Sequence, residues 1–134
     1  MWQAPEAGDI VWCRFPQRPR DKPGPKSRPA LAVSVVEHDD GISVTVAYGT
    51  SKKLDRMLSG EFAIRKAANS AAYAMAGLSF DTKFNLRDMV DLPWNEEFFG
   101  VPPDARHGQT PKMGSLHPCM MKDFASAARV VKRR

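Results

Sequence analysis

The sequence predicts an α+β domain in which a small, strongly curved antiparallel sheet or barrel is completed by a C-terminal helix. Strand-like segments fill the first half of the chain, a turn signal joins two of them into a hairpin, and a helical pattern closes the sequence. We expect residues 1–134 to form one domain, because this length buries a sizeable core and no repeat or linker divides it.

The first strand is expected over residues 8–15, "GDIVWCRF". Alternation places Val11, Cys13 and Phe15 on one face and Trp12 on the other, and we expect both aromatic residues in the core. The following "PQRPRDKPGPKS" is rich in proline, which removes backbone donors, so it is expected to be a long loop rather than sheet or helix.

A hairpin is expected from "RPALAVSVV", the turn signal "EHDDG" and "ISVTVAY". Arg28 opens the first of these strands, and Thr50 closes the second. Antiparallel pairing about a turn near Asp40 would bring Arg28 and Thr50 to the same end of the sheet.

The rest of the chain has weaker signals. We expect a short strand at "EFAIRK", one or two helical turns at "ANSAAYAMAGL", a strand over 80–86 and then a turn into "DLPW". Residues 95–113 are expected to be an irregular excursion, because they are rich in proline and glycine. The closing helix has Pro118 in its first turn, and its apolar stripe comprises Met121, Phe124, Ala128 and Val131.

Basic residues gather in two places on a chain of formal net charge +5. One is the tail "RVVKRR", and the other is the stretch that contains Arg18, Arg20, Lys22, Lys26 and Arg28. Such clusters attract polyanions, so they favour nucleic acid over a membrane or a small anion as partner. A solvated loop and a frayed tail remain the alternative interpretation.

Several function classes lack support in the sequence. There is no apolar run of membrane-spanning length, no signal-peptide pattern and no phosphate-binding glycine motif. Cys13 and Cys119 are expected to be reduced thiols in a cytoplasmic protein. His38, His107 and His117 have no metal-ligand spacing, so we expect no metal and no cofactor.

The remaining candidates for chemistry lie around one end of the hairpin: Arg28, Thr50, Ser51, Lys52 and Lys53. The planar fork of arginine suits a phosphate and a pentacoordinate phosphorus transition state, and a threonine hydroxyl can donate to another phosphoryl oxygen. RNA carries its own nucleophile, the ribose 2′-hydroxyl. Alternatively, Arg28 is a strand-edge cation, Thr50 bonds its own turn, and the two lysines are solvated or steer phosphates.

"GDIVWCRF", the basic loop, "RPALAVS" and "VAYGTSKK" together resemble the PemK/MazF toxins of bacterial toxin–antitoxin systems. "FDTKFNLRDMVDLPW" is similar to the family's late strand and following turn. "MGSLHPCMMKDFASAARV" is similar to its closing segment, a short strand or turn that leads into a terminal helix. The resemblance covers most of the chain, and the first-strand and RPAL segments are its most specific parts.

The resemblance implies a homodimeric, barrel-like fold that cleaves single-stranded RNA without a metal, leaving a 2′,3′-cyclic phosphate and a 5′-hydroxyl. It assigns catalysis to Arg28 and Thr50, with Ser51 as the alternative to Thr50, and RNA binding to the basic loop. It also implies growth inhibition, control by a cognate antitoxin and DNA binding together with that antitoxin.

Three features depart from the family pattern. The loop has only Asp21 as an acidic residue, where several relatives carry a glutamate that assists proton transfer. Residues 95–113 are longer than usual, and Tyr48 and Gly49 replace a proline-containing approach to the threonine.

These departures keep a second hypothesis open, a non-enzymatic RNA-binding or interaction module on the same fold. A gyrase poison is a third hypothesis. It is disfavoured because such relatives share a C-terminal Trp-Gly-Ile, whereas this sequence ends "VVKRR". Trp94, in a polar context, is expected at an interface or on RNA.

Overall fold

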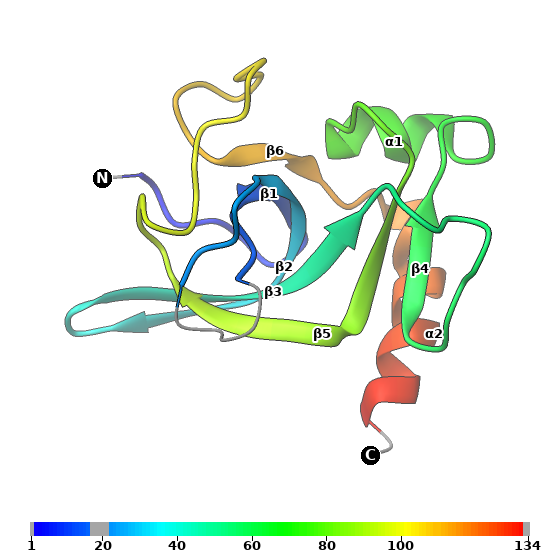
Figure 1. The fold of residues 1–134 in the computed structure, drawn as a ribbon, viewed down its shortest axis with the longest axis horizontal. Coiled ribbons are helices and arrows are strands. Elements are labelled where there is room, and N and C mark those ends of the chain that lie inside the picture. Colours follow the sequence, from blue (N-terminus) through cyan, green and yellow to red (C-terminus); the bar gives the residue numbers. More distant parts are fainter. Residues whose placement is uncertain (1, 17–21, 133–134) are drawn as a thin grey trace.

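The computed structural model describes residues 2–16 and 22–132. The described chain forms an antiparallel sheet with two α-helices and one 3-10 turn (Figure 1). The elements in chain order are β1 (Asp9–Cys13), β2 (Arg28–His38), β3 (Gly41–Thr50), β4 (Glu61–Ile64), α1 (Ser70–Ala76), β5 (Thr82–Pro93), β6 (Lys112–Ser115), η1 (Pro118–Met120) and α2 (Met121–Lys132).

The strands of the described residues form one sheet in the order β4-β5-β3-β2-β1-β6. Every recorded pairing between them is antiparallel. Strands β4 and β6 lie at the two edges, so the sheet is open and a closed barrel is not confirmed. The antiparallel sheet with a C-terminal helix agrees with the predicted α+β class.

Strand β5 bends where its pairing register with β3 changes (Figure 1). Ala47 pairs with Met89, but the next residue, Tyr48, pairs with Asn85. The extra β5 residues form an irregularity, and the backbone N–H of Leu86 donates instead to the carbonyl of Gly60 at 2.9 Å. Such insertions bend a strand and increase its twist. Half of β5 can therefore pair with β4 while the other half continues along β3.

Both faces of the sheet bury apolar side chains, as the alternation in β1 predicts. Val11, Cys13 and Phe15 join one cluster with residues 98 and 99, which cover that face. Ile10 belongs to the other cluster, which includes residues of α1 and α2. Trp12 packs against this second cluster while remaining half-buried.

Several expectations about the second half of the chain are corrected. Strand β5 continues through "DLP" to Pro93, so no turn precedes Trp94. Trp94 is only 4% exposed, and its indole N–H donates to the carbonyl of Gln3, because the N-terminal segment covers it. Met121 is 49% exposed, so it lies outside the buried stripe of α2, which Ala127 joins instead. No helix of the described residues is long and apolar enough to cross a membrane.

Candidate functional site

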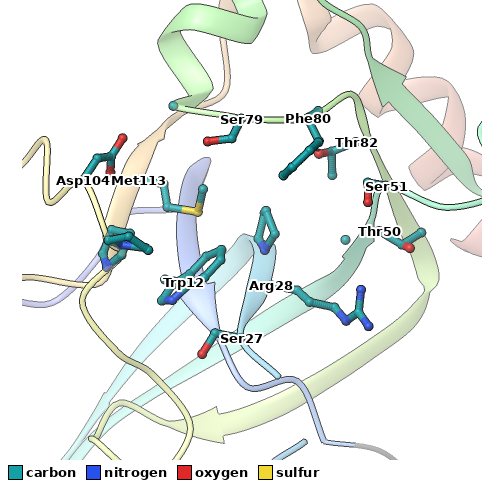
Figure 2. Close-up of a pocket in the computed structure, with 15 residues that line it drawn as sticks. Trp12, Ser27, Arg28, Thr50, Ser51, Ser79, Phe80, Thr82, Asp104 and Met113 are labelled. Atoms are coloured by element: carbon teal, nitrogen blue, oxygen red, sulfur yellow. The ribbon is translucent and has the colours of Figure 1, made fainter. Parts of the chain in front are cut away.

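The β2–β3 hairpin places Arg28 and Thr50 at the same end of the sheet, as the sequence predicts. The strands reverse across a two-residue turn between His38 and Gly41, and Ala30 lies opposite Tyr48 at the other end of the recorded pairing. Arg28 and Thr50 both line a cavity of about 360 Å³. Figure 2 shows the Arg28 side chain extending toward the end of β3 that carries Thr50.

Gly49 allows the two strands to approach closely beside this cavity. A Cβ atom at this position would lie 2.2 Å from the carbonyl oxygen of Pro29 and 2.9 Å from the ring of Phe84. Any side chain would therefore push β3 away from β2. This close packing explains why glycine, and not proline, precedes Thr50 in this chain.

The Thr50 hydroxyl accepts a hydrogen bond from the backbone N–H of Lys52 at 3.1 Å. This is the turn-forming bond that the alternative interpretation expected. It uses the oxygen as acceptor and leaves the hydroxyl proton able to donate to another group. Bonding the turn and contacting a phosphate are therefore compatible roles for Thr50.

The loop after Thr50 is held by a buried ion pair. Thr50 lies opposite Lys83 in the β3–β5 pairing. The Lys83 Nζ atom lies 3.0 Å from Glu61 Oε1, and the two side chains are 5% and 6% exposed. Nζ also donates to the carbonyl of Arg56, and Glu61 accepts from the backbone N–H of Leu58. This network fixes residues 56–61 beside the candidate site, and sequence analysis did not identify it.

The other predicted basic residues that the structure describes lie outside the cavity lining. Ser51 lines the cavity and is exposed, whereas Lys52 and Lys53 are exposed without lining it. Lys22 and Lys26 are also exposed, on the segment that leads into β2. Arg18 and Arg20 lie outside the described residues.

Other walls of the cavity come from residues that the sequence does not assign to the site. Trp12 on β1, Phe80 before β5, Met113 on β6 and the loop residues Pro102 and Asp104 all line it (Figure 2). The exposed fraction of Phe80 is 71%, so much of its ring is accessible to solvent. The sequence signal for these residues is weak, because they meet only in the folded chain.

The thiols and histidines form no further site in the described part of the chain. Cys13 is fully buried and Cys119 is exposed. Burial raises the pKa of the Cys13 thiol to about 12, and the Arg14 guanidinium partly counters this effect. Among residues 2–16 and 22–132, no three His, Cys, Asp or Glu side chains lie together as a possible metal site. His117 instead caps η1, since its Nδ1 accepts from the backbone N–H of Cys119 at 3.0 Å.

The fold is an open antiparallel sheet that carries Arg28 and Thr50 on one cavity at a hairpin end. Comparison with known proteins identifies the family. The family model described as "PemK-like, MazF-like toxin of type II toxin-antitoxin system" matches residues 6–88, which is more than half of the chain. The chain therefore belongs to the PemK/MazF toxin family.

Comparison with solved structures agrees with this assignment at the level of the fold. One similar structure is an "Endoribonuclease in complex with its cognate antitoxin from Mycobacterial species". It is 17% identical, has a TM-score of 0.57, and the match covers 98% of each chain. No curated protein matches the chain.

Proposed function

We propose that this protein is a toxin endoribonuclease that cuts single-stranded RNA by attack of the ribose 2′-hydroxyl on the adjacent phosphate. The observation that carries the proposal is the joint placement of Arg28 and Thr50 on one cavity at the end of the β2–β3 hairpin. Family membership supports the same reaction class. A similar structure is that of an endoribonuclease with its antitoxin, which supports control by a cognate antitoxin.

In the proposed reaction the 2′-oxygen forms a bond to phosphorus as the bond from phosphorus to the 5′-oxygen breaks. The products are a 2′,3′-cyclic phosphate and a 5′-hydroxyl. The attacking 2′-hydroxyl loses one proton and the leaving 5′-oxygen gains one, so protons and charge balance. Arg28 stabilises the charge that develops on the phosphoryl oxygens, and Thr50 donates a hydrogen bond to one of them. Arg28 does not act as the base, because its guanidinium stays protonated.

The surrounding cations act in binding rather than in chemistry. Lys22, Lys26, Lys52 and Lys53 are exposed close in sequence to Arg28 or Thr50, so they are positioned to attract the phosphates on either side of the cut. Ser51 offers a second hydroxyl at the cavity. We propose that the segments carrying these lysines form part of the surface that the antitoxin covers. We also propose that the toxin is a homodimer.

The test compares the wild-type protein, Arg28→Ala and Lys122→Ala on a long single-stranded RNA in EDTA, with the fragment ends mapped. Lys122 is exposed on α2, so its substitution removes one positive charge without touching the cavity. We expect specific cuts with 5′-hydroxyl ends from the wild type and from Lys122→Ala, and a loss of about 10²-fold or more in Arg28→Ala.

Three results would contradict the proposal. Equal cutting by all three proteins would place the activity at a different site or in a contaminant. Cutting that appears only after a divalent metal is added would refute the metal-independent mechanism. RNA binding without any cutting would support the non-enzymatic binding module instead.

A further inference from the structure

The cavity lined by Arg28 and Thr50 has a positive charge at one end and a negative charge at the other. Among the described residues that line it, Arg28 is the only cation and Asp104 is the only carboxylate. Figure 2 shows them on opposite sides of the cavity, with Trp12 and Met113 between them and Phe80 on a further side. A nucleotide has the matching polarity, because its phosphate is anionic and the edge of its base carries hydrogen-bond donors.

Phe80 is an exposed aromatic residue on a fixed backbone. Its carbonyl accepts a hydrogen bond at 2.8 Å from the hydroxyl of Thr82, a residue that is only 2% exposed. On its other side, Leu78 is buried and Gly77 ends α1 in the left-handed region, with φ of 70°. A Cβ on Gly77 would lie 2.0 Å from the carbonyl oxygen of Met113, so helix and strand are in close contact there. The backbone that carries the ring is therefore held in place, although little covers the ring itself.

Trp12 provides a second aromatic surface on another side of the same cavity (Figure 2). Proteins bind unpaired bases by stacking them on aromatic side chains, and such stacking tolerates any base. The cavity volume of about 360 Å³ lies within the usual range of small-ligand sites. The apolar walls thus suit the flat faces of a base, while the ends suit its polar parts.

Asp104 supplies selectivity that stacking lacks. Its Oδ2 atom pairs with Arg106 Nε at 2.8 Å, and both side chains are about half exposed, so the pair is solvated and exchangeable. A carboxylate accepts hydrogen bonds and donates none. Adenine, cytosine and guanine present an amino group on the pairing edge, whereas uracil presents two carbonyl oxygens and one N–H.

We propose that this cavity is a base-selective subsite, in which Phe80 and Trp12 stack the nucleobase next to the scissile phosphate and Asp104 selects a base with an amino group over uracil. The inference rests on the proposed function, since it takes the ligand to be RNA with a phosphate at Arg28. It adds a specificity-determining role for three residues outside the basic loop and the Arg28–Thr50 pair.

The first test measures binding of the four nucleoside 3′-monophosphates and 5′-monophosphates, which requires no cleavage. We expect the wild type to bind at least one amino-bearing nucleotide about tenfold more tightly than the uridine nucleotide. Phe80→Ala is expected to weaken all binding by about tenfold, and Phe80→Tyr to restore it. Asp104→Asn is expected to remove the discrimination against uridine, because an amide both donates and accepts.

Matched controls separate these roles from structural ones. Arg106→Gln breaks the same ion pair as Asp104→Asn but keeps the carboxylate, so it should keep the preference. Leu58→Ala removes another exposed apolar side chain, 62% exposed, that does not line the cavity, and should bind like the wild type. Thermal melting of each variant reports whether the fold is retained.

The second test reads base frequencies beside the cut in a randomised RNA pool. Cutting that disfavours uridine at one flanking position, with this bias lost in Asp104→Asn alone, supports the inference. A uniform loss of rate in Asp104→Asn with unchanged bias would assign Asp104 to proton transfer and overturn it. Absence of nucleotide binding at millimolar concentration would also overturn it. Selective nucleotide binding without RNA cutting would uphold the subsite and contradict the proposed nuclease.

Discussion

At the scale of single residues, the Thr50 hydroxyl has one observed role and one proposed role. It accepts the backbone N–H of Lys52, and within the described part of the chain it donates to no side chain or carbonyl. The accepted bond holds the oxygen in place, and the hydroxyl proton can still rotate toward an acceptor. The geometry of the turn therefore supports the proposed phosphate contact rather than competing with it.

Replacing Thr50 separates the two roles. Thr50→Val removes the hydroxyl at similar volume and is expected to lower the RNA cleavage rate by about 10²-fold, the usual effect of losing one transition-state donor. Loss of the turn bond should cost only about 1 kcal/mol of stability. Thr50→Ser keeps both functions and should cleave within roughly tenfold of the wild type. Cleavage by Thr50→Val at the wild-type rate would limit Thr50 to its turn.

Cys13 shows how burial changes the chemistry of a single atom. Its pKa is raised from an ordinary value of 9.0 to about 12 by loss of solvent, with Arg14 acting in the opposite direction. Between pH 9 and 12 the unfolded thiol ionises while the folded thiol keeps its proton. The unfolded state then binds fewer protons, so stability is complete below pH 9 and falls as the pH rises toward 12.

This pH dependence is measurable by urea denaturation. Raising the pH from 8 to 10 should lower the stability of the wild type by roughly 1 kcal/mol more than that of Cys13→Ala. Thiol labelling at pH 8 offers an independent check, since the exposed Cys119 should react in the folded protein and Cys13 only after unfolding. An identical pH response in both proteins would contradict the buried-thiol explanation.

At the scale of elements, the Lys83–Glu61 pair joins β5 and β4 and holds the chain that follows β3. Both charges are almost fully buried, and each makes a further bond to the backbone of residues 56–58. A buried pair of this kind contributes little net stability compared with apolar residues, but either charge alone is costly. Its importance lies in keeping the loop beside Thr50 in one conformation.

A double-mutant cycle tests this interpretation. Lys83→Met leaves the Glu61 carboxylate buried without its cation, and we expect a loss of about 3–5 kcal/mol in unfolding free energy. The double variant Lys83→Met with Glu61→Leu should regain most of that loss and yet cleave RNA more slowly than the wild type. If the losses of unfolding free energy in Lys83→Met alone and Glu61→Leu alone add up to the loss in the double variant, the two residues are not coupled.

The elements that sequence could predict are those with local signals. The β2–β3 hairpin follows from its alternation and turn residues, and α2 follows from its apolar stripe, whereas Pro118 begins η1 rather than α2. The sequence predicts a strand that ends too early, because Pro93 is typical of a turn. Proline is nevertheless tolerated at the end of β5, where the strand pairs with β3 on one side only. Trp94 was misjudged because its polar sequence neighbours gave no sign of the N-terminal segment that covers it.

At the scale of the whole molecule, the net charge of +5 predicts that the proposed RNA binding depends on ionic strength. The measurement is the affinity for an uncleavable single-stranded RNA, with 2′-deoxyribose at the cut, between low and moderate salt. Lys52→Gln is expected to reduce the slope of log affinity against log salt by about 0.7, the value for one lost phosphate contact on a single strand. Lys122→Gln on α2 should leave the slope unchanged.

The sequence predicts only part of the candidate site, because the other part is assembled by long-range packing. Arg28 and Thr50 are brought together by one hairpin, so pairing rules alone place them. Phe80 and Asp104 reach the same cavity from segments on either side of β5, and no local pattern links them to β2 or β3. Long-range packing carries that information, and it becomes visible only in the folded chain.

The site thus combines one local hairpin with segments that are distant in sequence, and this affects the order in which it assembles during folding. A hairpin closes within about 1–10 μs, whereas contacts between distant segments must first overcome a larger loop-closure entropy. We therefore expect Arg28 and Thr50 to come together before the wall that bears Asp104. A nick or transient opening in the 95–111 segment would leave the proposed cutting pair intact while removing the wall that we assign to base selection. On these proposals, a partly opened molecule would lose fidelity before it loses toxicity.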